Sequence, residues 1–140
     1  MIYYAAFDTN VLISSLLTKK TDTATAKVVD AIAEQRIIPL YSEEIFEEYN
    51  EVLRRPKFPF SREHIDHILE MIKQFGIVVD PGSTGEILPD EDDLVFYEVV
   101  MEKRDEGAYL ITGNIKHFPE KSFIVTPAEM MEILEKSDNE

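Results

Sequence analysis

Acidic side chains stand at three places in this 140-residue sequence where they could together hold a metal ion. Asp8 follows a short apolar run at the amino end, Glu48 lies in an acid-rich segment, and Asp90 and Asp93 open a later segment. Carboxylates around one or two hard cations, with water in the remaining positions, are typical of magnesium or manganese sites that act on phosphates. The sequence therefore predicts such a site, provided that the fold brings these carboxylates together.

Short apolar segments alternate with amphipathic ones along the chain. Runs rich in β-branched and aromatic residues predict strands at Ile2–Phe7, Arg36–Tyr41, Ile77–Val79, Ala108–Thr112 and Phe123–Val125. Helical spacing and capping residues predict helices over 11–17, Thr23–Gln35, Ser42–Arg54, Ser61–Gly76 and Asp92–Arg104, and a last helix capped by Thr126. This alternation predicts a single domain over residues 1–140, a three-layer α/β/α sandwich with a central parallel sheet of about five strands.

The predicted sheet decides which polar residues can meet, because ligands of an open parallel sheet bind beyond the carboxyl ends of its strands. Asp8 follows the first strand and Asn114 follows the strand that ends at Thr112, so we expect them to be neighbours. The helix that begins near Asp93 is expected to start at the opposite edge, unless the loop before it crosses over. In the predicted helix over Ser42–Arg54, successive residues are rotated by about 100°, and Glu48 is then the acid that lies closest to the apolar face. A carboxylate half-buried there needs a partner, and a cation is one.

Five segments resemble, in order and spacing, the sequence blocks of the PIN-domain ribonucleases. They are FDTNVLISSLL at 7–17, SEEIFEEYNEVLRRPKF at 42–58, PDEDDLVFYEVV at 89–100, AYLITGNIKHFP at 108–119 and VTPAEMMEIL at 125–134. The last three are similar to the branch of PIN domains that act as toxins of toxin–antitoxin systems. The resemblance covers essentially the whole chain. It implies a PIN-like fold, metal-dependent hydrolysis of RNA with Mg²⁺ or Mn²⁺, a homodimer, and an antitoxin protein as partner.

The resemblance also implies roles for individual residues. Asp8, Glu48 and Asp93 match the family's metal-binding acids, and Asp90 matches an additional acid that is common in this branch. Polar residues that line the family's site match Asn10 and Thr112.

Asn114 is a candidate catalytic residue that departs from the family's pattern, since many relatives have Asp at this position. Relatives with Asn there often carry an acid three residues later, where this chain has His117. An Asn carbonyl accepts a hydrogen bond from bound water but brings no negative charge to a cation. The sequence therefore does not decide whether a second metal ion can bind. Glu98, just over one turn beyond Asp93, is a further candidate for the missing acid.

Ordinary structural roles compete with these assignments. Asp8 alone would fit a turn or a helix cap, and N-capping explains Asp90 about as well as metal contact does. His64 and His67 lie three residues apart but off the apolar face of their helix, which favours solvated side chains. His117 either touches a substrate phosphate or is a loop residue without a role.

Three functions are compatible with these patterns. The leading hypothesis is an endoribonuclease that uses Mg²⁺ or Mn²⁺ and acts as the toxin of a toxin–antitoxin pair. The alternative is a non-catalytic RNA-binding or regulatory module whose metal site is degenerate at Asn114. A third is a phosphotransfer enzyme with Asp8 as nucleophile, because residues 7–10 resemble the opening of haloacid-dehalogenase-like phosphatases. Those enzymes need a second acid where this chain has Asn10.

The charge of the chain is strongly negative, with 28 acidic against 14 basic residues and a formal net charge of −14 at pH 7. This balance argues against a protein held to nucleic acid or membrane by bulk positive charge. Much of the acid falls near the predicted metal site, whereas the bases gather in or beside loops. Contacts with RNA phosphates are expected from Lys19, Lys20, Arg54, Arg55, Lys57 and Lys116.

The absence of cysteine excludes disulfides, cysteine-based zinc sites and a thiol nucleophile. No segment approaches the roughly 20 apolar residues that a membrane helix needs, and the amino end has no basic stretch typical of a signal peptide. We therefore expect a cytoplasmic protein with no membrane partner.

Overall fold

The computed structural model describes residues 1–139. Its strands are β1 (Tyr3–Phe7), β2 (Ile37–Tyr41), β3 (Ile77–Val78), β4 (Tyr109–Ile111) and β5 (Ile124–Val125). Its helices are α1 (Thr9–Leu17), α2 (Ala24–Ala33), α3 (Glu43–Leu53), α4 (Arg62–Phe75), α5 (Leu94–Glu102) and α6 (Pro127–Asp138), with 3-10 turns η1 (Glu91–Asp93), η2 (Arg104–Glu106) and η3 (Ile115–His117). None of the helices in this part of the chain is both long enough and apolar enough to cross a bilayer.

The five strands form one parallel sheet in the order β3-β2-β1-β4-β5, which confirms the predicted architecture. The central strand β1 pairs with β2 on one side, where Tyr3 lies opposite Ile37. On its other side it pairs with β4, where Phe7 lies opposite Ile111. The direction in which successive strands are added reverses between β1 and β4. Such a reversal opens a crevice at the carboxyl ends of the two strands.

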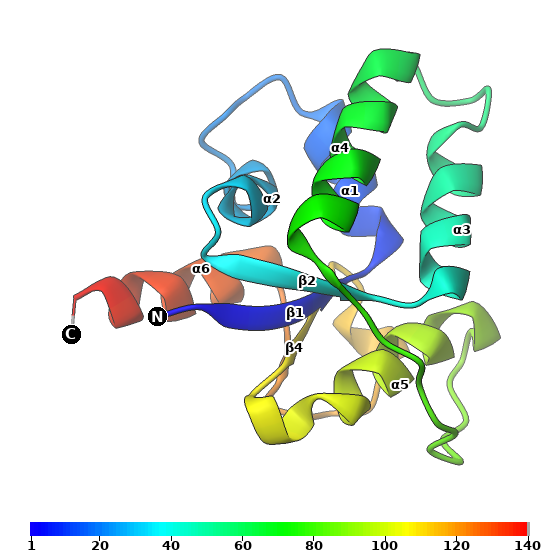
Figure 1. Ribbon diagram of the computed structural model, residues 1–140, viewed down its shortest axis with the longest axis vertical. Coiled ribbons are helices and arrows are strands. Elements are labelled where there is room, and N and C mark those ends of the chain that lie inside the picture. The colour runs from blue at the N-terminus through cyan, green and yellow to red at the C-terminus, as the bar shows by residue number, and fades with distance from the viewer. Residues whose placement is uncertain (140) are drawn as a thin grey trace.

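Helices cover both faces of the sheet. Figure 1 shows α1, α2, α3 and α4 on one side of the strands and α5 on the other. Helices α2, α3 and α4 contact β2, whereas α5 contacts β1, β2 and β4. The last helix, α6, packs against α2 and β5. This is the expected three-layer sandwich, and it leaves the carboxyl edge of the sheet between the starts of α1, α3 and α5.

Capping side chains explain where most helices begin. The helices α2, α3, α4 and α6 start after hydroxyl residues whose side chains accept hydrogen bonds from first-turn amides, namely Thr23, Ser42, Ser61 and Thr126. At α6, Thr126 and Glu129 complete the predicted capping box around Pro127. These are local signals, so the helix starts follow directly from the sequence.

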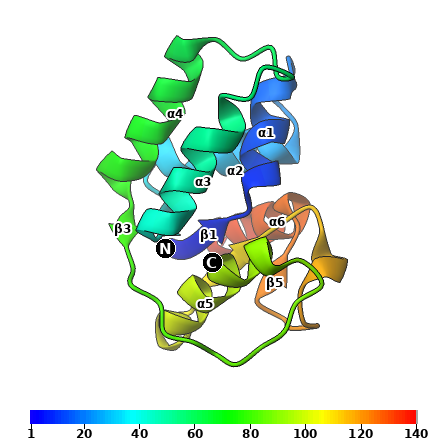
Figure 2. The same cartoon turned by 90° about the vertical axis from the view of Figure 1, so that its right-hand side faces the viewer.

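The connection between β3 and α5 is a long irregular segment over residues 79–90. Figure 2 shows it sweeping around α5 before it turns back to the start of that helix. Carboxylates of α5 hold it in place: Glu102 accepts a hydrogen bond from the Gly82 amide at 3.1 Å, and Glu98 accepts one from the Thr84 amide at 2.6 Å. Glu98 is therefore committed to this loop, so the suggestion that it supplies the missing acid of the site was wrong.

Helix α5 starts at the carboxyl edge of the sheet, where Asp93 shares a cleft with Asp8. This decides between the two alternatives that the spacing left open, in favour of a start on the same side as Asp8. A helix that joins two parallel strands must run back antiparallel to them, so it begins where the first strand ends.

Gly76 allows the end of α4 to pass close to β2. A Cβ atom at this position would lie 2.4 Å from the carbonyl oxygen of Ile72 and 2.7 Å from that of Pro39. Both are backbone atoms that cannot rotate away. The φ angle of Gly76 is −94°, so close packing rather than backbone conformation requires glycine here.

We predict that Gly76→Ala lowers the free energy of unfolding by about 1–3 kcal/mol, because the methyl group forces α4 and β2 apart. Gly113→Ala is the matched control, since a Cβ at Gly113 meets nothing within 4 Å. It should change stability by no more than about 0.5 kcal/mol. Urea denaturation of both variants measures the difference, and equal stabilities would contradict the packing explanation.

Candidate metal centre

Asp8 occupies the end of β1 and the N-cap of α1, and it is only 3% exposed. One carboxylate oxygen, Oδ2, accepts a hydrogen bond from the Thr112 hydroxyl at 2.7 Å. The other, Oδ1, accepts a long one from the Asn10 amide at 3.4 Å. Burial raises the pKa of Asp8, and the hydrogen bond from Thr112 offsets only part of this rise. Asp8 therefore both caps α1 and lines the candidate site.

Glu48 is half-buried on α3, as its place on the helix predicted. Its Oε2 atom accepts a hydrogen bond from the hydroxyl of Thr9, the residue that follows Asp8. The pKa of Glu48 is raised first by burial and then by repulsion from other carboxylates, Asp8 among them. The Asp8 carboxylate is thus close enough to Glu48 to oppose its ionisation.

Tyr49, on the buried face of α3, is a positioning residue that the sequence did not single out. It is 1% exposed, and its hydroxyl donates a hydrogen bond to the carbonyl oxygen of Phe7. Its ring packs against Phe96 of α5, with ring centroids 6.2 Å apart. A buried tyrosine hydroxyl needs a hydrogen-bond partner, so a tyrosine on the apolar face of the helix could have indicated such a contact from the sequence.

Asp93, the last residue of η1, carries a carboxylate that is only partly compensated by its neighbours. Its side chain is 14% exposed, and its Oδ2 atom has no hydrogen-bond partner among the described residues. His117 Nδ1 lies 3.3 Å from this oxygen, but not in hydrogen-bond geometry. Burial is the main cause that raises the pKa of Asp93 to about 6, followed by repulsion from Asp8 and Asp90.

Asp90 is exposed and caps η1, since its Oδ1 atom accepts a hydrogen bond from the Asp92 amide at 3.0 Å. It also lines the same cleft as Asp8, Glu48 and Asp93. The capping role is therefore established, and contact with a metal remains a prediction.

One cleft of about 490 Å³ brings these acids together at the carboxyl edge of the sheet. Its charged lining consists of one guanidinium, that of Arg55, and eight carboxylates, those of Asp8, Glu44, Glu47, Glu48, Glu51, Asp90, Asp92 and Asp93. Arg55 itself is paired with Glu51 at 2.9 Å. The cleft is therefore strongly negative.

The carboxylates that line the cleft are hard oxygen donors, the kind of ligand that a divalent cation such as Mg²⁺ prefers. Within residues 1–139, no three acid or histidine side chains are close enough to ligate one ion as they stand. Instead, Asp8 is bonded to Thr112 and Glu48 to Thr9. Hard oxygen donors, pKa values raised by burial and repulsion, and a buried Asp93 oxygen without a partner are what a cation such as Mg²⁺ or Mn²⁺ would satisfy.

Asn114 lies beside this cleft rather than in it. Together with Asn10, which borders both, it lines a neighbouring hollow of about 460 Å³. The backbone amide of Asn114 donates to the hydroxyl of Thr112 at 2.9 Å, and that hydroxyl in turn donates to Asp8. Thr112 is fully buried. The backbone of Asn114 is therefore linked to Asp8 through Thr112.

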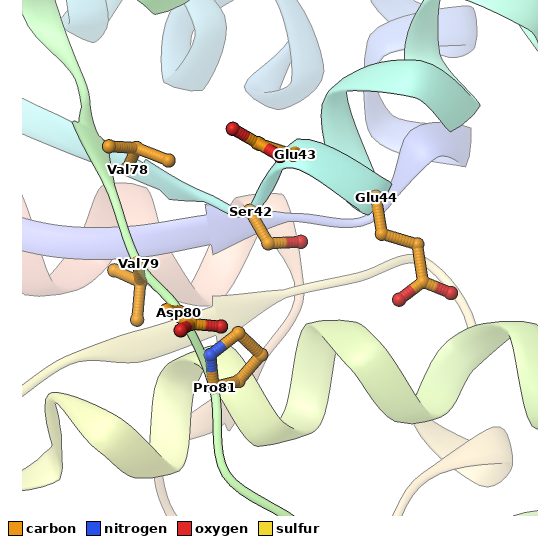
Figure 3. Close-up of a pocket in the computed structure, with 7 residues that line it drawn as sticks. All are labelled: Ser42, Glu43, Glu44, Val78, Val79, Asp80 and Pro81. Carbon is orange, nitrogen blue, oxygen red and sulfur yellow. The ribbon is translucent and has the colours of Figure 1, made fainter.

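Another hollow, of about 610 Å³, adjoins the acid cleft on the side of β3 and shares Glu44 with it. Figure 3 shows its lining, with Ser42, Glu43 and Glu44 at the start of α3 across from residues 78–81. The Ser42 side chain caps α3 by accepting from the Ile45 amide at 3.1 Å. None of the predicted site residues lines this hollow.

The basic residues that were predicted to contact RNA phosphates differ in whether their side chains already have a partner in the protein. Lys19 and Lys20 lie exposed in the connection from α1 to α2, and Lys116 is exposed in η3 near the cleft. Arg54 pairs with Asp66. Two more are engaged locally: Arg55 with Glu51, and Lys57 above the Phe58 ring.

Comparisons with known proteins identify relatives of this chain. The sequence model of the PIN domain matches residues 4–116. The uncharacterized protein MJ1680 of Methanocaldococcus jannaschii is 29% identical over 146 aligned positions, which cover 92% of this chain and 90% of that protein. The crystal structure of PAE2754 from Pyrobaculum aerophilum superimposes with a TM-score of 0.58 at 12% identity, covering 96% of this chain and 90% of the other. The last similarity concerns the fold alone.

We predict that the metal-free protein loses stability as pH rises from about 4 to about 7. The pKa of Asp93 is about 6 in the folded state, against an ordinary pKa of 3.8 for this side chain. The folded state therefore holds the proton more tightly and becomes less stable as it leaves. Two pKa units correspond to about 3 kcal/mol, which solvent screening in an open cleft reduces to about 1–2 kcal/mol.

Asp93→Asn removes this charge, so it should stabilise the metal-free protein at neutral pH and change little near pH 4. Urea denaturation in the presence of a chelator, at several pH values, measures the effect. Asp105→Asn, an exposed acid of η2, is the control. An Asp93→Asn variant less stable than the parent at neutral pH would show that the carboxylate is well compensated.

Proposed function

The chain belongs to the PIN domain family, and on that premise we propose that it is an endoribonuclease that uses Mg²⁺ or Mn²⁺ to hydrolyse RNA phosphodiester bonds. PIN domains are in general nucleases, and they typically use divalent metals. One observation carries the proposal. Asp8, Glu48 and Asp93 come from three different elements and line one cleft with raised pKa values.

In this proposal the three acids hold the cation, with Asp90 at the rim of the cleft. When bound, Mg²⁺ or Mn²⁺ supplies activation of water and neutralisation of the charge that builds on the phosphate. The protein's own contribution is to orient the carboxylates. In the metal-free protein Thr112 holds Asp8 and Thr9 holds Glu48 beside the cleft through side-chain hydrogen bonds, and both carboxylates would turn towards the cation when it binds.

The finer biological role follows from the resemblance of segments 89–100, 108–119 and 125–134 to PIN-domain toxins. We propose that the protein acts as the toxin of a toxin–antitoxin pair and forms a homodimer. The acidic cleft supports the idea of an antitoxin partner, because an arginine side chain matches a pocket lined by carboxylates in charge and in hydrogen bonding. A cytoplasmic location belongs to the same proposal.

A non-catalytic RNA-binding or regulatory module is the second candidate. It is favoured by the position of Asn114, which is neutral and lies outside the acid cleft. The PIN family assignment leaves the hypothesis of a phosphotransfer enzyme with Asp8 as nucleophile without support. The buried, hydrogen-bonded state of the Asp8 carboxylate also disfavours nucleophilic attack.

We predict that Asp8→Asn, Glu48→Gln and Asp93→Asn each lower Mn²⁺-dependent RNA cleavage at least about a hundredfold, as loss of a group that positions charge in the reaction does. The substitutions remove charge without changing side-chain size, so the fold should persist by circular dichroism. Cleavage of a fluorescent RNA is the readout. Asp105→Asn, at the other edge of the sheet, is the matched control and should cleave like the parent.

Full activity in Asp8→Asn and Asp93→Asn would overturn the assignment of the metal site. RNA binding without cleavage at saturating Mn²⁺ in the parent protein, with cleavage gained in Asn114→Asp, would instead establish the non-catalytic module.

We further predict that RNA binding depends on a few bases and is strongly sensitive to salt. Arg55→Ala and Lys116→Ala should each reduce the slope of log affinity for a single-stranded RNA against log salt by about 0.7 for each phosphate that the removed side chain neutralises in the parent protein. Lys136→Ala, near the end of α6, should leave the slope unchanged. Fluorescence anisotropy with a labelled RNA at several salt concentrations measures this, and unchanged slopes in both test variants would contradict the prediction.

A further inference from the structure

His117 approaches the one buried oxygen of the site that lacks a hydrogen bond. Its Nδ1 atom lies 3.3 Å from Asp93 Oδ2, yet a proton placed on that nitrogen would not complete a hydrogen bond to the oxygen. The two atoms lie within ion-pair distance when the imidazole is protonated, but the contact does not have hydrogen-bond geometry. Such an arrangement needs an explanation, because a buried carboxylate oxygen without a partner is costly.

The separation of these two atoms matches that of neighbouring ligands of one cation. Oxygen and nitrogen ligands of small divalent cations lie about 2.0–2.2 Å from the ion. Two such ligands at right angles are therefore about 3 Å apart. The observed 3.3 Å is close to this value.

The backbone holds His117 in place while leaving its ring accessible. The His117 amide donates a hydrogen bond to the Asn114 carbonyl oxygen at 2.9 Å, which closes the turn η3. The next residue, Phe118, is 7% exposed and anchors the turn in the core. The His117 side chain itself is 48% exposed. It also lowers the pKa values of both Asp8 and Asp93, so the ring lies near two acids that come from different elements.

We propose that His117 is a ligand of the divalent cation and binds it through the imidazole nitrogen beside Asp93. The proposal rests on the metal site of the proposed function. Neither Asn114 nor His117 is among the residues that line the acid cleft, but the His117 ring contacts Asp93 of that lining, whereas Asn114 brings no charge and lines the neighbouring hollow. The loop after β4 therefore contributes its metal donor three residues later, at His117.

A nitrogen ligand changes which cation the site prefers. Mg²⁺ binds almost only oxygen, whereas imidazole suits the transition metals, whose affinities rise from Mn²⁺ through Fe²⁺ and Co²⁺ to Ni²⁺. A site with three carboxylates and one imidazole should therefore bind Mn²⁺ more tightly than Mg²⁺. Without the imidazole, the preference should shrink.

Pulsed electron paramagnetic resonance of the Mn²⁺ complex tests this inference, because electron spin echo modulation detects a ¹⁴N nucleus bound to Mn²⁺. We expect a histidine nitrogen signal in the parent protein and its loss in His117→Gln. The protein has three histidines, and His64 and His67 are exposed on α4. His64→Gln and His67→Gln are therefore matched controls that should keep the signal.

Calorimetric titration with each metal gives a second readout. His117→Gln should bind Mn²⁺ about tenfold more weakly, at the lower end of the loss seen when a supporting group of a metal site is removed. Its affinity for Mg²⁺ should change less than about threefold, since Mg²⁺ gains little from nitrogen.

The possible outcomes separate this inference from the proposed function. Mn²⁺-dependent RNA cleavage without any histidine nitrogen signal in the parent protein would overturn the role of His117 and leave the three-acid site intact. A weaker Mn²⁺ affinity in His117→Gln without that signal would make His117 a residue that only orients Asp93, and this also overturns the inference. Absence of Mn²⁺ binding together with absence of cleavage would overturn both proposals.

Discussion

A single buried hydrogen bond, from the hydroxyl of Tyr49 to the carbonyl oxygen of Phe7, joins the elements on which the site depends. Phe7 ends β1 directly before Asp8, and Tyr49 follows Glu48 in α3, so the bond fixes the backbone segments that carry the two carboxylates relative to each other. The Tyr49 ring packs on Phe96 of α5, the helix that follows the third acid. Leaving a buried carbonyl unpaired costs about 1–3 kcal/mol. The same residue therefore closes the core and aligns the cleft.

The rest of the fold has to support a cleft that opposes folding. Burial raises the pKa values of Asp8, Glu48 and Asp93, and repulsion from nearby carboxylates adds to the rise at Glu48 and Asp93, which means that each ionised carboxylate is less stable here than in water. Hydrogen bonds from the hydroxyl groups of Thr112 and Thr9 partly offset this penalty for Asp8 and Glu48. The apolar strands β1 and β4, with fully buried side chains at their carboxyl ends, supply the stability that offsets the remainder. A bound cation would lower the same penalty directly, because its positive charge stabilises the ionised carboxylates.

Local patterns in the sequence predicted the elements and their order, and sheet topology predicted that Asp8 would meet the end of β4. All strands and helices lie within about two residues of their predicted bounds, because capping residues and apolar periodicity are local signals. The contacts of Thr9 with Glu48 and of Tyr49 with Phe7 join residues 39 and 42 positions apart. Such pairs depend on how α3 packs on β1, which no local pattern specifies. The commitment of Glu98 to the 79–90 loop escaped prediction for the same reason.

The concentration of acidic residues in the cleft couples the binding of a cation to the binding of RNA. Eight carboxylates and one paired guanidinium line the cleft, so an RNA phosphate approaching it is repelled while the carboxylates are ionised and no cation is bound. A divalent cation lowers that repulsion, and a phosphate in turn adds a ligand for the cation. Linkage requires the two effects to be equal, so whatever factor the cation adds to RNA affinity, RNA adds to cation affinity. A net charge of −14 is therefore compatible with an RNA substrate, because the acid is concentrated where a cation would bind first.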